Sequence, residues 1–129
     1  MKIVYDSFTG NVERFVRKLD GIYDTVRITD SLIVDEPFCL VTYTIGFGQV
    51  PESTSNFLLH NSNNLLGVAS SGNKNWGDFF AQAGPKIASA YDVPLMLQFE
   101  LGGTVDNVDT FVQEVERLVQ HSHLDSIQQ

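Results

Sequence analysis

Four short and nearly unbroken apolar runs limit the fold of this sequence more than any other feature. They cover residues 2–5, 38–44, 65–71 and 93–99, and a weaker run covers residues 25–28. Strands that are buried on both faces have this composition, because helices shield both sides of their sheet from water. The sequence therefore predicts a five-stranded parallel sheet with helices on both faces.

Helical patterns lie between most of the predicted strands. Apolar residues recur at helical spacing over residues 12–19 and again over residues 111–119. A third helix is predicted to begin near Pro51, because proline suits a first helical position. A fourth is predicted over residues 76–91, with a kink or break at the internal Gly84-Pro85 pair. The alternation of strands and helices predicts an α/β three-layer sandwich.

No repeat or linker interrupts the chain, and its 129 residues suit one domain. Residues 1–120 are expected to form that single domain, and residues 121–129 are expected to form a polar, frayed C-terminal tail. The link over residues 29–37 joins the second and third strands without an apolar stripe of helical spacing. This link is therefore predicted to be a loop.

Charge and hydropathy narrow the possible partners. The formal net charge of −8 argues against nucleic acid, because binding phosphates requires an excess of Lys and Arg. The same acidity favours solubility or attraction to a basic protein face, and charge alone leaves both open. No apolar run reaches the thickness of a bilayer, and Asp6 comes too early for a signal peptide. The expected location is therefore cytoplasmic, without a membrane partner.

Cysteine and histidine residues point to no metal site. The single cysteine, Cys39, lies within an apolar run and is interpreted as a small buried side chain. His121 and His123 are two positions apart, so they cannot share one helix face. These two residues and His60 are interpreted as surface residues. We predict no bound metal and no catalytic side chain.

Ligands of such sheets bind beyond the carboxyl ends of the strands, where three loops are predicted to lie. The first covers residues 6–11 and opens directly into a helix, where backbone N–H groups favour an anion. Its hydroxyl residues, Ser7 and Thr9, and its Gly10 suit a phosphate held by neutral donors. Ser, Thr and Asn are also ordinary helix caps. This loop alone leaves the two interpretations open.

The second loop, over residues 44–51, places two glycines beside an aromatic residue in Gly46-Phe47-Gly48. Glycine permits peptide orientations that are closed to other residues, so this backbone can approach a flat ligand and can flip. A turn with a buried Phe47 is the alternative interpretation. The candidate ligand contacts in this loop are Thr44, Ile45, Gly46 and Phe47.

The third loop, over residues 70–77, contains the only tryptophan of the sequence, Trp76, among turn-forming residues. Trp76 is either a stacking platform for an aromatic ligand or a part of the core. The candidate contacts in this loop are Ser71, Gly72, Asn73, Trp76 and Gly77. Together the three loops suit a mononucleotide with a large planar ring.

The sequence lacks the motifs of several other classes of nucleotide-binding and phosphate-binding site. No Gly-x-Gly-x-x-Gly follows a strand and no Gly-Lys-Ser/Thr closes the first loop, which excludes a dinucleotide fingerprint and a triphosphate loop. The predicted third strand ends without the acidic residue that a response-regulator receiver domain phosphorylates. The first loop has neither the cysteine nor the arginine of a low-molecular-weight tyrosine phosphatase.

Four segments of this sequence resemble the NrdI family of flavodoxin-like proteins. They cover residues 5–12, 42–51, 71–77 and 99–104, and the resemblance extends over nearly the whole chain. It implies a flavodoxin-like fold with strand order 2-1-3-4-5, and FMN as the cofactor. The implied phosphate donors are the hydroxyls of Ser7 and Thr9 and the N–H groups of Phe8, Gly10 and Asn11.

The same resemblance assigns the flavin ring to the second and third loops. Trp76 is the expected stacking partner, and the backbone of residues 71–73 is expected to bind the pyrimidine edge. The Gly46–Phe47 peptide is the candidate redox switch, because a flipped peptide offers its carbonyl oxygen to a protonated flavin nitrogen.

The resemblance also implies a role beside class Ib ribonucleotide reductase. Such an FMN protein reduces oxygen and delivers the oxidant, superoxide, to the dimanganese small subunit, whose tyrosyl radical then forms. The implied partners are that small subunit and a flavodoxin reductase or a similar electron donor. The protein is then an activation partner more than a stand-alone enzyme. A general flavodoxin-type electron carrier and an adaptor without flavin are the alternatives.

Overall fold

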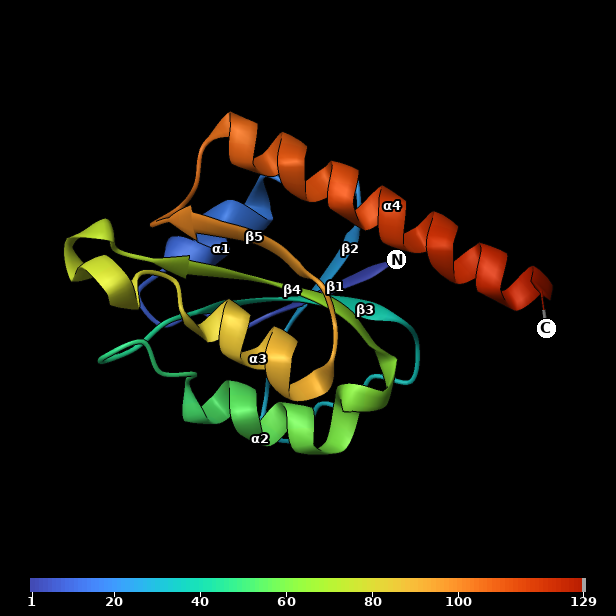
Figure 1. The fold of residues 1–129 in the computed structure, drawn as a ribbon, viewed down its shortest axis with the longest axis horizontal. Coiled ribbons are helices and arrows are strands. Elements are labelled where there is room, and N and C mark those ends of the chain that lie inside the picture. The colour runs from blue at the N-terminus through green and yellow to red at the C-terminus, as the bar shows by residue number, and fades with distance from the viewer. Residues whose placement is uncertain (129) are drawn as a thin grey trace.

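Five parallel strands form the centre of the molecule. The computed structural model describes the backbone of residues 1–128 and the side chains of residues 1–121. The strands are β1 (Lys2–Tyr5), β2 (Asp24–Arg27), β3 (Phe38–Tyr43), β4 (Leu65–Gly72) and β5 (Leu95–Glu100). They pair in parallel in the order β2-β1-β3-β4-β5 (Figure 1). The predicted fold class and strand order are confirmed.

Helices cover both faces of this sheet. They are α1 (Asn11–Arg17), α2 (Glu52–Asn61), α3 (Ala83–Tyr91) and α4 (Val105–Gln128), with short 3-10 helices η1 (Ser62–Asn64) and η2 (Lys74–Phe79). In Figure 1, α1 and α4 lie on one side of the sheet, and α2 and α3 lie on the other. Because the strands are parallel, their carboxyl ends and the loops that follow them meet at one edge of the sheet.

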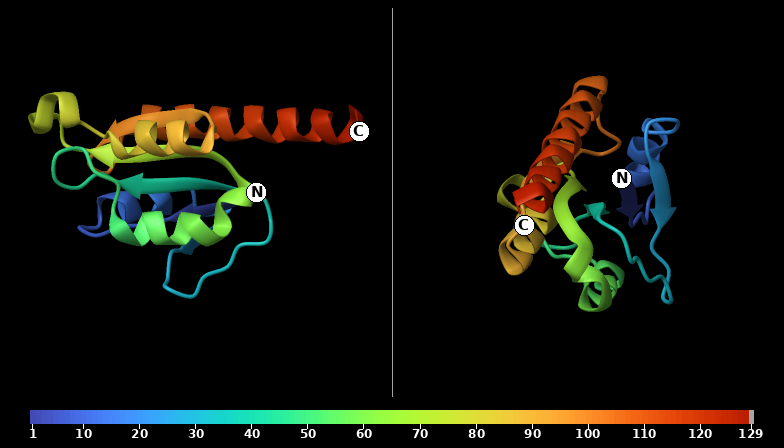
Figure 2. Two further views of the ribbon diagram at one scale, coloured as in Figure 1. Left: turned by 60° about the horizontal axis from the view of Figure 1, so that its bottom comes forward. Right: turned by 90° about the vertical axis from the view of Figure 1, so that its right-hand side faces the viewer.

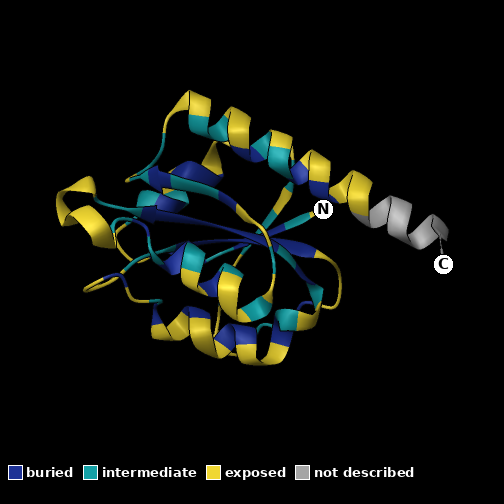
Figure 3. Cartoon of the chain, viewed as in Figure 1, coloured by how far each residue is buried: buried dark blue, intermediate teal, exposed yellow. Residues whose placement is uncertain are grey.

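Two buried clusters hold the layers together. Between α1, α4 and the sheet, the ring of Phe15 stacks on Phe99 with centroids 4.2 Å apart and meets the edge of Phe111 at 5.5 Å. On the other face, Phe38 meets Phe57 at 5.6 Å. Figure 3 shows the strands buried in the middle while the outer helix faces are exposed. The apolar runs that became β3 and β4 are thus buried on both sides, whereas the edge strand β5 is partly exposed.

The predicted helix over residues 76–91 breaks at a different place. The 3-10 helix η2 ends at Phe79, Ala81 has a φ of 50°, and α3 begins at Ala83. The Gly84-Pro85 pair lies in the first turn of α3 rather than at the break. Proline costs little there, because the first N–H groups of a helix have no partner within it.

The loop over residues 29–37 is confirmed, and Figure 2 (left) shows it entering β3 without a helix. Asn61 of α2 fixes this loop, because its side-chain oxygen accepts from the N–H of Val34 at 2.8 Å. Its amide nitrogen also donates to the carbonyl oxygen of Leu32 at 3.2 Å. Asn64 adds a third bond, because its amide nitrogen donates to the carbonyl oxygen of Val34 at 3.2 Å. Two asparagine side chains thus attach this loop to the end of α2 and to η1.

The structure differs from the expected frayed tail, because the backbone of residues 121–128 continues α4. The buried residues Phe111, Val115 and Leu118 pack α4 against the sheet. The division at residue 120 stays a prediction. His60 and His121 are exposed, as expected, whereas the side chain of His123 lies outside the described residues. No helix in the described chain is long and apolar enough to span a bilayer.

Cys39 is expected to resist thiol reagents in the folded protein. Its side chain has no exposed surface, and burial raises the pKa of its thiol to about 12. Little thiolate, the reactive form, therefore exists near neutral pH. An aromatic disulfide reagent should release one equivalent of chromophore from the denatured chain but only traces from the native protein. Rapid release from native protein would contradict the burial of Cys39.

Candidate functional site

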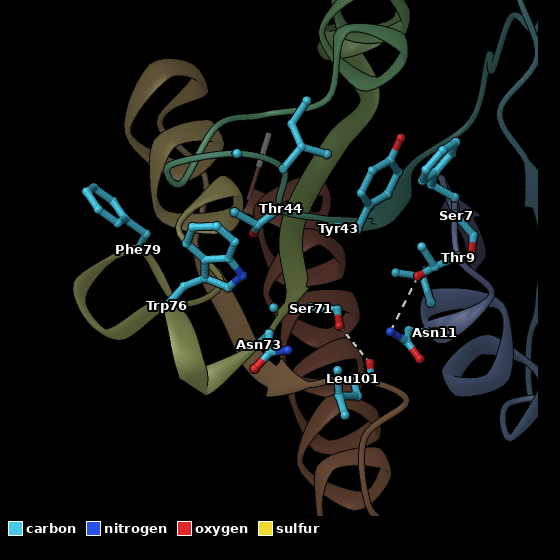
Figure 4. A pocket seen from close by; sticks show the side chains of 15 residues that line it. Ser7, Thr9, Asn11, Tyr43, Thr44, Ser71, Asn73, Trp76, Phe79 and Leu101 are labelled. Atoms are coloured by element: carbon cyan, nitrogen blue, oxygen red, sulfur yellow. Dashed lines mark hydrogen bonds between the residues drawn. The ribbon is translucent and has the colours of Figure 1, made fainter.

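A cavity of about 380 Å³ opens at the carboxyl edge of the sheet. Most of the residues predicted to contact a ligand line it: Ser7, Phe8, Thr9, Asn11, Thr44, Ile45, Gly46, Ser71, Gly72, Asn73 and Trp76. In Figure 4, Ser7, Thr9 and Asn11 lie at one end of this cavity and Trp76 lies at the other. The cavity thus has a polar end and an aromatic end. Gly10, Phe47 and Gly77 do not line it.

The polar end is the loop that joins β1 to α1. Ser7 is buried, and its Oγ accepts from the backbone N–H of Glu13 at 3.2 Å, which satisfies a donor of the first helical turn. Gly10 adopts a φ of 91°, a conformation that other residues rarely take. Thr9 Oγ1 accepts from Asn11 Nδ2 at 3.5 Å. The Ser7 hydroxyl therefore stabilises the first turn of α1, and Ser7, Thr9 and Asn11 all line the cavity.

The first residue of this loop, Asp6, carries a buried carboxylate. Asp6 Oδ2 accepts from Ser53 Oγ at 2.5 Å and from Thr54 Oγ1 at 2.7 Å, both in the first turn of α2. Thr54 also shares a hydrogen bond of 2.8 Å with Thr42 of β3. Because α2 follows the second loop directly, Asp6 connects the first loop to the second.

Tyr43, the last residue of β3, was missed by the sequence analysis. It lines the cavity, and its ring lies against that of Phe8 with centroids 6.2 Å apart and planes 21° from parallel. Burial, and then the carboxylate of Asp6, raise the pKa of the Tyr43 hydroxyl, against opposing contributions from Ser53 and Arg27. Its place beside Thr44 at a strand end was the available signal.

The second loop is a tight turn closed by two backbone hydrogen bonds between Ile45 and Gln49, of 3.0 and 2.8 Å. Gly46 has a φ of 51°, and a Cβ there would lie 2.7 Å from Gln49 Oε1. Phe47 is 67% exposed, so its interpretation as a buried residue is wrong. Its ring instead meets the edges of Trp76 at 5.9 Å and Phe79 at 5.7 Å.

The third loop is tied to the segment that follows β5. Ser71 Oγ donates to the carbonyl oxygen of Leu101 at 2.6 Å (Figure 4). The N–H of Leu101 donates to the carbonyl oxygen of Gly72 at 3.0 Å. Trp76 is 51% exposed, which excludes its interpretation as a core residue. Glu100 Oε2 accepts from the N–H of Lys74 at 3.0 Å and brings a negative charge to this loop.

Four further lining residues come from the fold rather than from the loop motifs: Val12, Tyr43, Phe79 and Leu101. Phe79 is at the end of η2 and Leu101 follows β5, so neither lay inside a predicted loop. Leu101 adopts a φ of 54°, which is uncommon for a residue with a side chain. The exposed rings of Phe47, Trp76 and Phe79 form an aromatic rim beside the cavity.

Comparison with known families decides what kind of protein has this site. The profile of the NrdI flavodoxin-like family matches residues 3–123. The chain belongs to this family. Membership implies that the protein is a flavoprotein, and the resemblance stated from the sequence motifs is thereby confirmed.

Several curated members of the NrdI family are similar over nearly their whole length. Protein NrdI of Bacillus licheniformis is 50% identical over 122 residues, which cover 95% of this chain and 92% of the relative. The SPbeta prophage-derived protein NrdI of Bacillus subtilis is 45% identical over 93% of this chain and 95% of its own. Protein NrdI of Macrococcus caseolyticus is 43% identical, with coverages of 99% and 98%.

Two solved flavodoxins have the same fold. A short-chain flavodoxin associated with a bacterial microcompartment superposes with a TM-score of 0.72 at 19% identity, covering 93% of this chain and 96% of its own. A point mutant of flavodoxin from Pseudomonas aeruginosa gives a TM-score of 0.57 at 20% identity, covering 92% and 97%. At these identities the likeness concerns the fold alone.

Proposed function

We propose that this protein binds FMN in the cavity at the carboxyl edge of the sheet. We propose further that it serves class Ib ribonucleotide reductase by helping to form the dimanganese-tyrosyl radical cofactor of the small subunit. The observation that carries the proposal is the joining of a polar loop and an aromatic rim in one cavity. Its volume, about 380 Å³, lies within the range of roughly 300–1,000 Å³ that is usual for cofactor sites.

The residues present fit the chemistry of a flavin mononucleotide. Thr9 and Asn11 offer polar side chains at the end where the phosphate would bind. Gly72 brings the backbone of β4 close to the segment after η2, since a Cβ on it would lie 2.4 Å from the backbone nitrogen of Ala81. Trp76 offers an exposed aromatic face to a planar ring.

Each part of the site then has one task. The first loop binds the phosphate, the backbone of residues 71–73 offers N–H and C=O groups to the ring edge, and Trp76 stacks on the ring. The Gly46–Phe47 peptide turns either its N–H or its C=O toward the cavity, with the freedom that glycine provides. When bound, FMN supplies the transfer of one or two electrons and the reaction with oxygen.

The reductase role is supported by the similarity to curated NrdI proteins over nearly the whole chain. The aromatic rim of Phe47, Trp76 and Phe79 is exposed beside the cavity, and apolar patches of this kind mark contact sites for other proteins. The small subunit would approach the flavin over this rim, as would a flavodoxin reductase or a similar donor. The flavodoxin fold of the structural neighbours also supports a second function, general electron transfer.

Two assays test these functions in sequence. Protein reconstituted with FMN should show a flavin absorbance spectrum after gel filtration, and its absence would indicate an adaptor without flavin. The reduced flavoprotein, mixed with the manganese-loaded small subunit and oxygen, should then yield a tyrosyl radical signal in electron paramagnetic resonance. A flavin-loaded protein that produces no radical, but still carries electrons between other redox partners, would favour the general electron carrier.

Replacing Trp76 with alanine is expected to weaken FMN binding by about two- to tenfold, because stacking of aromatic rings contributes about 0.5–1.5 kcal/mol. Trp76 is half-exposed, so the melting temperature should hardly change. The Trp76→Phe variant retains an aromatic ring and should recover most of the affinity. Titration by quenching of flavin fluorescence measures all three proteins. Equal affinity of the alanine variant and the parent would show that Trp76 does not contact the ring.

A further inference from the structure

Arg27, the last residue of the edge strand β2, contacts the first loop from outside it. Its Nη2 donates to the carbonyl oxygen of Ser7 at 2.5 Å. β2 pairs with β1 in parallel register, with Tyr5 opposite Arg27, so the guanidinium lies beside the end of β1. Twenty residues separate Arg27 from Ser7. The loop therefore has a cationic neighbour that its own sequence lacks.

This contact fixes the orientation of one peptide group. The peptide between Ser7 and Phe8 is trans, so its C=O and N–H point in opposite directions. Because Arg27 holds the C=O on the β2 side, the N–H of Phe8 points to the other side. Among the described residues, neither Phe8 N–H nor Thr9 N–H has a protein acceptor, although both residues line the cavity. These donors are available to an anion in the cavity.

The positive charge of Arg27 also affects how the first loop binds an anion. The carboxylate of Asp6 is buried one residue before Ser7, and it would repel a phosphate bound by the same loop. Arg27 offsets that repulsion, since its charge is close enough to oppose the effect of Asp6 on Tyr43. Arg14 is the other cation at the loop, and it donates to the side chain of Asn11 rather than to the backbone.

We infer that Arg27 is a positioning residue for the phosphate of the flavin, because it holds the Ser7–Phe8 peptide with its N–H toward the cavity. The inference rests on the proposed binding of FMN and adds a residue from outside the three loops. Arg27 does not line the cavity, so it acts through the loop. The planar guanidinium suits this task better than an ammonium group, because its donors are fixed in direction.

The test compares FMN with riboflavin, which has the same ring but no phosphate. Arg27→Met removes both the donor and the charge, and Arg27→Lys retains the charge. Arg117→Met is the matched control, because Arg117 is exposed on α4 and its guanidinium bonds only to Glu114 of the same helix. Affinities are measured by fluorescence titration at low salt and at about 0.5 M salt, where charges are screened.

We expect Arg27→Met to bind FMN about ten- to a hundredfold more weakly, as the loss of a hydrogen bond from a charged donor predicts. Riboflavin affinity should stay within about twofold, Arg27→Lys should lie between Met and the parent, and the control should match the parent. An unchanged ratio of FMN to riboflavin affinity in Arg27→Met overturns the inference. So does an effect that Arg27→Lys cancels fully and that salt removes, because charge alone would then explain it.

The amide resonance of Phe8 provides a readout that loss of stability does not mimic. In the parent protein, FMN should shift this resonance and riboflavin should not. In Arg27→Met, the shift should be reduced even at saturating FMN. A Phe8 amide that responds equally to both flavins overturns the inference while FMN binding stands. A parent protein that binds neither flavin removes the proposed function, and the inference with it.

Discussion

A Gly72→Ala variant is expected to be destabilised by about 2–3 kcal/mol and to lose most of its flavin affinity. The added Cβ would lie 2.4 Å from the nitrogen of Ala81 and 2.8 Å from its Cα. These are backbone atoms, so no change of rotamer relieves the contact. Ala81 already has a φ of 50°, a conformation that costs free energy in a residue with a Cβ. The segment between η2 and α3 must therefore move, and with it the third loop.

Urea and thermal unfolding measure the loss of stability, and FMN titration measures the loss of affinity. The melting temperature should fall by roughly 8–12 °C for a domain of this size. Gly102→Ala is the matched control, because the nearest atom to its added Cβ is Nε of the flexible Arg14 side chain, at 3.1 Å. This control should lose less than about 1 kcal/mol. A Gly72→Ala protein as stable as the control would show that the contact with Ala81 is readily relieved.

The sheet was predictable because burial on both faces is visible in the composition of each strand. The run over residues 38–44 became β3, whose residues from Phe38 to Thr42 are all buried. The loop over residues 29–37 was also predictable, since it lacks a helical stripe. The attachment of this loop through Asn61 was not predictable, because Asn61 lies in α2, more than twenty residues away in the sequence.

Local patterns identified most of the residues that line the cavity, whereas the bonds between its loops depend on the tertiary structure. The sequence placed Trp76 beside a turn but left open whether it packs in the core, and only its exposure decides the question. Leu101 reaches the cavity through its bonds to Ser71 and Gly72, thirty residues away in the case of Ser71. The sequence predicted that neutral donors of the first loop hold the phosphate. It did not reveal Arg27, because only the pairing of β1 with β2 brings this side chain to the loop.

The break before α3 was misplaced for a related reason. Gly84-Pro85 is the strongest helix-breaking pair in that segment, so the sequence pattern assigned the break to it. The chain instead turns at Ala81, whose carbonyl oxygen accepts from Ser70 Oγ at 2.6 Å, and the N–H of Gly84 donates to the same Oγ at 2.9 Å. A buried serine of β4 thus fixes where α3 begins.

An Asp6→Ala variant is expected to lose about 2–3 kcal/mol of stability, because the buried hydroxyl of Thr54 and the hydroxyl of the exposed Ser53 both lose their charged acceptor. Ser53 Oγ and Thr54 Oγ1 both donate to Asp6 Oδ2, at 2.5 and 2.7 Å. Thr54 keeps its bond to Thr42, which limits the loss. Asp6→Asn retains an oxygen that accepts from hydroxyls, so its loss should be about 1 kcal/mol. Asp20→Ala, on the exposed surface, is the control and should be neutral.

Hydrogen exchange then shows whether Asp6 connects the two loops. The first turn of α2, which holds Ser53 and Thr54, directly follows the loop over residues 44–51. Loss of the Asp6 acceptor should therefore raise amide exchange both in residues 6–11 and in residues 44–51, while β5 stays protected. FMN affinity should fall in parallel, because the cavity needs both loops in place at once. Faster exchange confined to residues 6–11 would show instead that Asp6 stabilises its own loop and does not transmit order to the ring side of the cavity.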